Sequence, residues 1–158
     1  MKKTMKVIEA LSLFQVLNEA SLQSMTRGSD KYAVIKALRA LRAVAQPFIE
    51  FRDDAVKRLA GPQHEQMVRQ EQEWLEATRS WEECGREGAA PVLAEEARQY
   101  RDRFTGELNA CLEEEAAREV EIELPVIGEE GMGGLLEGNP WTVPQAVLID
   151  HWLGGDDH

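Results

Sequence analysis

Apolar residues recur at steps of three and four residues along most of the chain, and this spacing is typical of amphipathic helices. A first helix is predicted from Thr4 to Met25, with Gly28 as its C-terminal cap. Its predicted face consists of Val7, Ala10, Leu11, Phe14, Leu17 and Ser21. A second is predicted from about Asp30 to Gly61-Pro62, with Lys36, Arg39 and Arg42 away from its apolar face. That apolar face consists of Tyr32, Ile35, Leu38, Leu41, Ala45, Phe48 and Val56.

The third predicted helix, from Gln63 to Cys84, is polar except for one narrow seam. Met67, Trp74 and Trp81 are seven residues apart, which is the spacing of a helix that packs against a single partner. This tryptophan seam either packs against the second or fourth helix or forms an exposed surface for a binding partner. We favour internal packing, because large aromatic stripes are usually core. The fourth helix is predicted from Pro91 to Ala117.

The hydrophobic period changes to two residues between Glu119 and Val126. Apolar residues there alternate with Glu119, Glu121 and Glu123, which predicts a short strand with one acidic face. A single strand is not stable alone, so we expect it to pair with residues 2–7 or with the same strand of another copy.

Two further segments complete the predicted fold. Gly128–Asn139 is predicted to be a glycine-rich loop, and Thr142-Val143-Pro144-Gln145 is a capping box that opens a last helix ending at Leu153. The expected class is therefore mostly α, an antiparallel hairpin or bundle of about four helices with a short strand and a short C-terminal helix. We expect residues 1–158 to form a single domain, with 118–158 as a strand–loop–helix appendage of the helical core.

Charge is unevenly distributed along the 158 residues. The chain has 18 Lys and Arg against 29 Asp and Glu, a formal charge of −11, which argues against direct binding of nucleic acid. The basic residues are concentrated in the first 60 positions, so the two halves either attract each other or present a docking surface. No apolar run approaches the length of a membrane-spanning helix, so we expect no membrane partner.

The motifs of common catalytic and metal sites are missing. There is no phosphate-binding loop, and His64-Glu65 has Val68 where a zinc-protease motif needs a second histidine. Cys84 and Cys111 are too far apart for a Cys-x-x-Cys metal site. The tail residues Asp150-His151 and Asp156-Asp157-His158 are expected to hold a divalent cation only adventitiously. The sequence therefore predicts no enzyme, no cofactor and no specific metal. Two isolated cysteines and the lack of a secretory signal predict a cytoplasmic protein.

The order of several segments resembles a family. A basic helix, Lys31–Arg39, and an acidic stretch, Leu108–Glu115, precede the alternating strand Glu119–Ile127 and the terminal Trp141–Gln145 helix start. This order resembles small bacteriophage and prophage proteins of unassigned function, in which a helical hairpin is followed by an acidic alternating strand and a short helix. The resemblance implies a phage-derived interaction protein that acts in the host cytoplasm.

Three functions remain open. The first is a non-enzymatic interaction or assembly protein, adaptor-like or chaperone-like, that uses helix faces and an edge strand. The second is an acidic mimic of nucleic acid that inhibits a host DNA-binding or defence protein. The third is an enzyme with a site assembled across a dimer. Protein partners are expected in each case, including a second copy as a homodimer. The candidate partner-binding residues are Met67, Trp74, Trp81, Glu119, Glu121 and Glu123.

Overall fold

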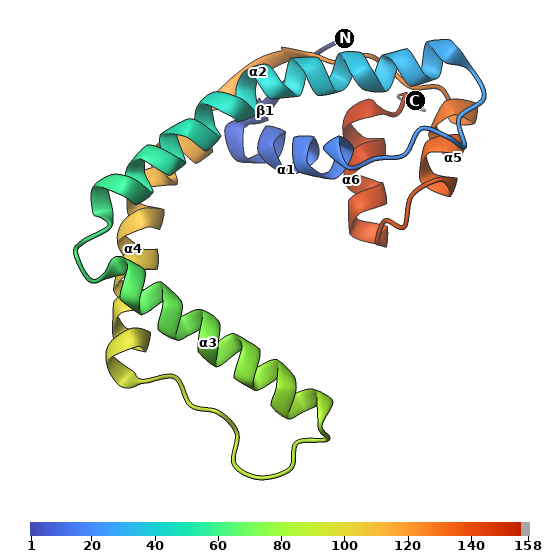
Figure 1. Cartoon of the computed structure of the whole chain (residues 1–158). Helices are drawn as coiled ribbons and strands as arrows, with labels where there is room; N and C mark the ends of the chain where they lie inside the picture. Colours follow the sequence, from blue (N-terminus) through green and yellow to red (C-terminus); the bar gives the residue numbers. More distant parts are fainter. Residues whose placement is uncertain (156–158) are drawn as a thin grey trace. The chain divides into compact units, whose positions relative to one another are not determined.

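The computed structural model describes residues 1–155, most of which are helical (Figure 1). In chain order its elements are β1 (Lys2–Lys6), α1 (Val7–Asn18), α2 (Gly28–Leu59), α3 (His64–Glu83), α4 (Glu95–Ala117), β2 (Glu119–Glu123), α5 (Glu129–Glu137) and α6 (Val143–Leu153). This confirms the expected mostly α class with a short strand pair and a short C-terminal helix.

The chain divides into two compact units. Met1–Glu50 and Glu114–His158 form the first, and Phe51–Glu113 form the second, so the boundaries fall within α2 and α4. The expectation that residues 1–158 fold as a single domain stays a prediction.

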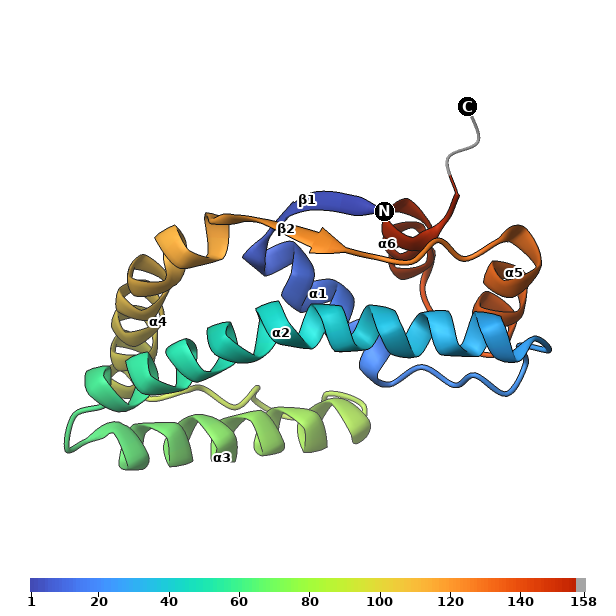
Figure 2. The same ribbon diagram turned by 90° about the horizontal axis from the view of Figure 1, so that it is seen from above.

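The first unit contains a two-stranded antiparallel sheet. β1 pairs with β2 in a register that runs from Lys2 opposite Glu123 to Lys6 opposite Glu119. The pairing expected between the acidic strand and residues 2–7 is therefore confirmed, and β2 lies between β1 and α2 (Figure 2). The first helix accordingly does not begin at Thr4, because residues 2–6 alternate between exposed and buried positions as the ladder requires.

α1 supplies much of the core of this unit. Its expected apolar face is confirmed by burial of Val7, Ala10, Leu11, Phe14 and Leu17, together with Leu13. The helix ends at Asn18 rather than Met25, and Gly28 begins α2 instead of capping α1. The segment between α1 and α2 is held by Asn139 instead. The Asn139 side chain accepts from the Ser21 N–H at 2.7 Å and donates to the Ser21 carbonyl at 2.9 Å.

The buried face of α2 differs from the predicted one near its start. Within the first unit the helix buries Val34, Ala37, Leu41, Ala45 and Phe48. Tyr32 is 48% exposed and Ile35 is 43% exposed, so their assignment to the core was wrong. Two apolar stripes compete along this helix, and the smaller residues Val34 and Ala37 face the core.

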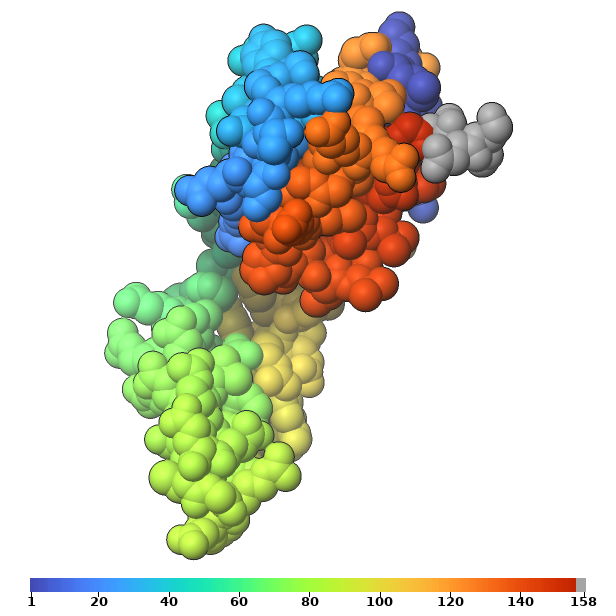
Figure 3. All heavy atoms as spheres, turned by 90° about the vertical axis from the view of Figure 1, so that its right-hand side faces the viewer, coloured from blue at the N-terminus to red at the C-terminus, as the bar shows by residue number. Residues whose placement is uncertain are grey.

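The glycine-rich segment is a helix, which corrects the expectation of a loop at Gly128–Asn139. It forms α5, where Gly131 and Gly134 face the residues that precede and open α2. A Cβ at Gly131 would lie 2.6 Å from the Asp30 carboxyl carbon, and one at Gly134 would lie 2.8 Å from the Ser24 carbonyl oxygen. Figure 3 shows this blue segment against the orange helix. Close packing against main-chain atoms therefore requires glycine at position 134, whereas the Asp30 side chain can move away from a Cβ at position 131.

α6 begins as the sequence predicts. The Thr142 hydroxyl accepts from the Gln145 N–H, and the Gln145 side chain accepts from the Thr142 N–H at 2.9 Å, so the capping box is confirmed. The helix ends before Gly154, and Ile149, Trp152 and Leu153 are buried.

The second unit is a helical hairpin with a small core. α3 matches its predicted range within one residue at each end. α4 begins at Glu95 rather than Pro91, because the chain from Pro91 to Ala94 is non-helical and lies along α3. Buried Met67, Leu93 and Ala97 form a hydrophobic cluster in this unit.

Candidate interaction surfaces

The tryptophan seam packs within the second unit. Met67 is 4% exposed and contacts Leu93 and Ala97, with partly buried Trp74 and Tyr100 against the same cluster. The arrangement corresponds to internal packing on the fourth helix and on the chain that leads into it. Trp74 and Trp81 each retain some exposed surface.

Both indoles of the seam hold the connection between α3 and α4. The Trp74 Nε1–H donates to the Pro91 carbonyl at 3.0 Å, and the Trp81 Nε1–H donates to the Gly88 carbonyl at 3.3 Å. The turn at the end of α3 has positive φ at Gly85, Arg86 and Gly88, which the two glycines adopt without a steric penalty. The two indoles thus hold a connection that contains no helix or strand.

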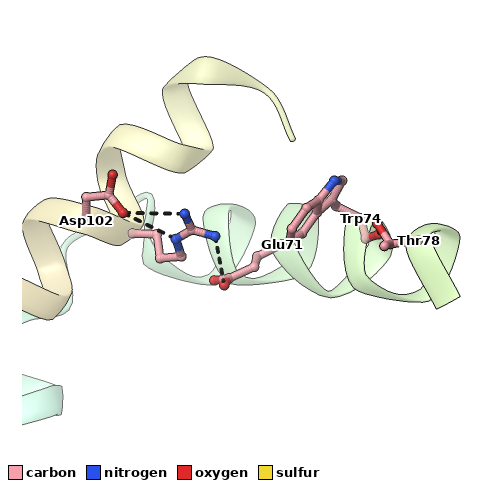
Figure 4. A network of polar contacts seen from close by, with 5 residues as sticks. Glu71, Trp74, Thr78 and Asp102 are labelled. Atoms are coloured by element: carbon pink, nitrogen blue, oxygen red, sulfur yellow. Dashed lines mark hydrogen bonds and ion pairs between the residues drawn. The ribbon is translucent and has the colours of Figure 1, made fainter. Parts of the chain in front are cut away.

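A polar network lies beside the seam (Figure 4). The Arg101 guanidinium is 3.7 Å from the Glu71 carboxylate and 3.4 Å from that of Asp102. The Thr78 hydroxyl donates to the Trp74 carbonyl at 2.8 Å, one helical turn earlier. Arg101 and Glu71 are partly exposed, so their ion pair contributes little stability but links α3 to α4.

A groove of about 360 Å³ opens between α3 and α4 in this unit. Its apolar lining includes Met67, Val68 and Phe104. His64 Nδ1 and the Tyr100 hydroxyl oxygen are 2.7 Å apart and share a hydrogen bond. The polar groups of the groove pair with one another, so it presents mainly apolar surface and no assembled nucleophile and base among its described lining residues.

The carboxylates of the acidic strand are exposed on one face of the sheet. The register places Glu123 opposite Lys2, Glu121 opposite Thr4 and Glu119 opposite Lys6. Directly opposite residues share a face of the sheet, so Lys2 and Lys6 lie beside the carboxylates of β2. The N-terminal ammonium also lies 2.9 Å from the Glu123 carboxylate. This face is therefore a mixed surface of both charges.

A third surface was predicted only in part, because the sequence placed Lys36, Arg39 and Arg42 off the apolar face but assigned Tyr32 and Ile35 to the core. The outward side of α2 carries Tyr32, Ile35, Lys36, Arg39 and Arg42, all exposed, which we call the basic face. The Lys36 Nζ lies 4.9 Å from the Tyr32 ring centroid. The three cations of this face, Lys36, Arg39 and Arg42, have no carboxylate within 4 Å among the described residues. The sequence has no acidic residue between Asp30 and Glu50, and this gap identifies the basic face in the sequence.

Within residues 1–155 no three His, Cys, Asp or Glu side chains converge as metal ligands. Of the adventitious cation site predicted at Asp150-His151 and Asp156-Asp157-His158, the last three residues lie outside the described part of the chain.

Comparison with known proteins adds no relative. A scan against family models and searches of curated proteins and of solved structures found no match. In the described part of the chain, no helix combines the length and apolarity needed to cross a bilayer.

Proposed function

We propose that this chain is a non-enzymatic interaction or assembly protein of phage or prophage origin that docks an acidic protein partner on the basic face of α2. The host cytoplasm is the proposed location, because isolated cysteines without a disulfide framework are typical of reducing compartments. The basic face carries the proposal, since exposed apolar side chains and several unpaired cations occur together there.

Charge supports docking at this position. The stretch from Lys31 to Ile49 contains four cations and no carboxylate, although the whole chain has a charge of −11. Unpaired cations on an acidic protein favour a partner that supplies carboxylates locally. Exposed Tyr32 and Ile35 lie among these cations and offer the apolar contact that stabilises protein interfaces.

The size of the basic face favours a protein partner over nucleic acid. Tyr32 and Arg42, the ends of the basic face, are ten positions apart, which spans about 15 Å of helix. Binding to a phosphate backbone relies on cations spread over a larger basic surface, and the net charge of this chain opposes it. A local acidic patch on another protein matches both the extent and the apolar content of this surface.

Affinity capture from the native host, lysogen or infected culture tests the proposal. Wild type is compared with Lys36→Glu/Arg39→Glu and with Arg79→Glu/Arg98→Glu, which makes the same change in net charge at exposed positions of α3 and α4. We expect wild type and the second variant to retain the same acidic partner, and the first variant to lose it. Equal recovery by all three proteins would contradict docking at the basic face.

The acidic-mimic function remains an alternative proposal. Its strongest sequence feature, the row Glu119, Glu121 and Glu123, shares its face with Lys2 and Lys6, and this weakens the resemblance to a run of phosphates. Capture of a nuclease or other DNA-binding protein, released by double-stranded DNA or by high salt, would favour the mimic instead.

Self-association is a further proposal. Pairing of β2 with β1 within one chain removes the unpaired strand as a reason to expect a dimer, and leaves the partly exposed seam as the other reason. Sedimentation equilibrium over a range of concentrations measures it directly. A constant monomer mass would exclude the homodimer.

A further inference from the structure

The outer edge of β1 presents unpaired main-chain groups. Leu124 N–H donates to the Met1 carbonyl at 3.0 Å, and Val7 N–H donates to the Arg118 carbonyl at 2.9 Å. Main-chain groups alternate in direction along a strand, so the odd-numbered residues of β1 bond to β2. The N–H and C=O groups of Lys2 and Thr4 therefore point away from β2.

These groups have no other partner in the described chain. Outside the β1–β2 ladder, no hydrogen bond within residues 1–155 involves the main chain of Lys2 or Thr4. The free edge ends at Lys6, whose N–H donates to the Glu9 carboxylate at 3.0 Å. Two donors and two acceptors thus form a short, defined edge.

The surroundings leave this edge accessible. Figure 2 shows β2 and then α2 on one side of β1, and no helix or strand on its other side. Lys2 and Thr4 are both exposed. The strand also carries Lys3 and Lys6, so the edge is strongly basic.

We propose that the open edge of β1 binds an extended acidic segment of a partner protein as an added antiparallel strand. β2 shows which sequence suits β1, because its Glu-Val-Glu-Ile-Glu pattern places glutamates opposite Lys2 and Lys6 and apolar residues toward the core. The outer edge offers the same side chains to a second strand. Opposite residues share a face, so the added strand carries its carboxylates beside Lys2 and Thr4.

A second copy of the chain fits this edge less well. Two β1 edges related by a two-fold axis would bring lysines against lysines, and like charges directly opposite are unfavourable. The glutamate strand of another copy is already paired with its own β1. The acidic segment is therefore assigned to a different protein. This surface is separate from the basic face.

Binding of a labelled synthetic peptide, Arg-Glu-Val-Glu-Ile-Glu-Leu-Pro, to the full chain tests the proposal by fluorescence anisotropy. Thr4→Pro removes the outward N–H and leaves the β1–β2 ladder, since proline is tolerated where an edge N–H faces solvent. Thr4→Val keeps that N–H and the branched shape. We expect Thr4→Pro to weaken binding by about tenfold or more and Thr4→Val to bind as wild type does.

Modified peptides separate strand addition from exchange with β2. In an added antiparallel strand the glutamate N–H groups face β1, whereas in β2 the apolar residues donate to it. N-methylation of the glutamates should abolish binding, and N-methylation of Val and Ile should preserve it. The reverse result would mean exchange with β2 and would overturn the proposal, as would equal binding of a peptide with lysines in place of glutamates.

Two further measurements keep the outcomes distinct. The Lys36→Glu/Arg39→Glu variant should bind the peptide as wild type does, so loss of its captured partner would bear on the basic face alone. Sedimentation of the protein without peptide tests whether a second copy of the chain occupies the edge of β1. Self-association that Thr4→Pro abolishes would assign the edge to a second copy and overturn the assignment to another protein.

Discussion

Glycines of α5 differ in role although they are close in sequence. Gly134 meets main-chain atoms of Ser24 and Met25, which cannot move aside as a flexible side chain would, whereas Gly133 is exposed with open space around it. We expect Gly134→Ala to lower the free energy of unfolding by about 1–3 kcal/mol through overpacking.

Gly133→Ala is the matched control for that substitution. Alanine is the better helix former, so we expect it to raise the free energy of unfolding by about 0.5–1 kcal/mol. Urea denaturation followed by circular dichroism measures both variants. Equal effects at the two positions would mean that close packing of α5 does not explain its glycines.

The two tryptophans of the seam make the same kind of hydrogen bond in different surroundings. Trp74 lies against the buried cluster, and its bond to Pro91 is the shorter of the two. We expect Trp74→Phe to cost about 1 kcal/mol in unfolding free energy and Trp81→Phe to cost less, because water can replace the bond at the more exposed position. Chemical denaturation of the two variants checks the order, and a larger cost for Trp81→Phe would reverse the interpretation.

At the scale of elements, opposite charges and a shared buried face both favour the observed pairing of β1 with β2. Lys6 lies directly opposite Glu119, and a slip of one residue would place Met5 and Ile122 on different faces of the sheet. We expect Lys6→Glu and Glu119→Lys each to destabilise the protein and the double variant to recover part of the loss. A double-mutant cycle should give a coupling of about 0.2–1 kcal/mol that declines with salt. A coupling of zero would show that the apolar face alone sets the register.

Periodicity predicted the elements that are amphipathic along their own length. The range of α3, the buried face of α1 and the capping box at Thr142 all follow from local spacing, and the structure confirms them. α5 was missed because its glycines read as breakers, while the contact that requires them involves Ser24 and Asp30, more than a hundred positions away. Local sequence cannot specify such a contact.

The same limit applies to the candidate surfaces. Spacing identified the tryptophan seam and the acidic strand, but exposure depends on what covers each face. Tyr32 and Ile35 have the residue types of core positions, and their exposure follows from α2 burying Val34 and Ala37 instead. The sequence alone shows that no acidic residue lies between Asp30 and Glu50. It does not show that this face of α2 is exposed, which is needed to identify the stretch as a surface.

At the scale of the whole molecule, the first unit contains both the basic N-terminal part of the sequence and its acidic C-terminal part. Residues 1–50 contain eight Lys or Arg and four acids, whereas residues 114–158 contain one Arg and eleven acids. Pairing of β1 with β2 and the Arg27–Glu130 ion pair at 2.6 Å join these two parts. Attraction between these two segments therefore accounts for some of the uneven charge distribution. The cations of the basic face are not compensated in this way.

Burial is just as unequal between the units. α1 in the first unit buries six side chains, from Val7 to Leu17, whereas α3 in the second buries Met67 alone. Elements with few buried apolar contacts open at a lower free-energy cost. We expect amide protons of α3 to exchange roughly tenfold or more faster than those of α1, measured by hydrogen–deuterium exchange with mass spectrometry after correction for intrinsic rates. Equal protection would instead indicate one cooperative domain, as the sequence predicts, and faster exchange in α3 would mean that the second unit opens separately.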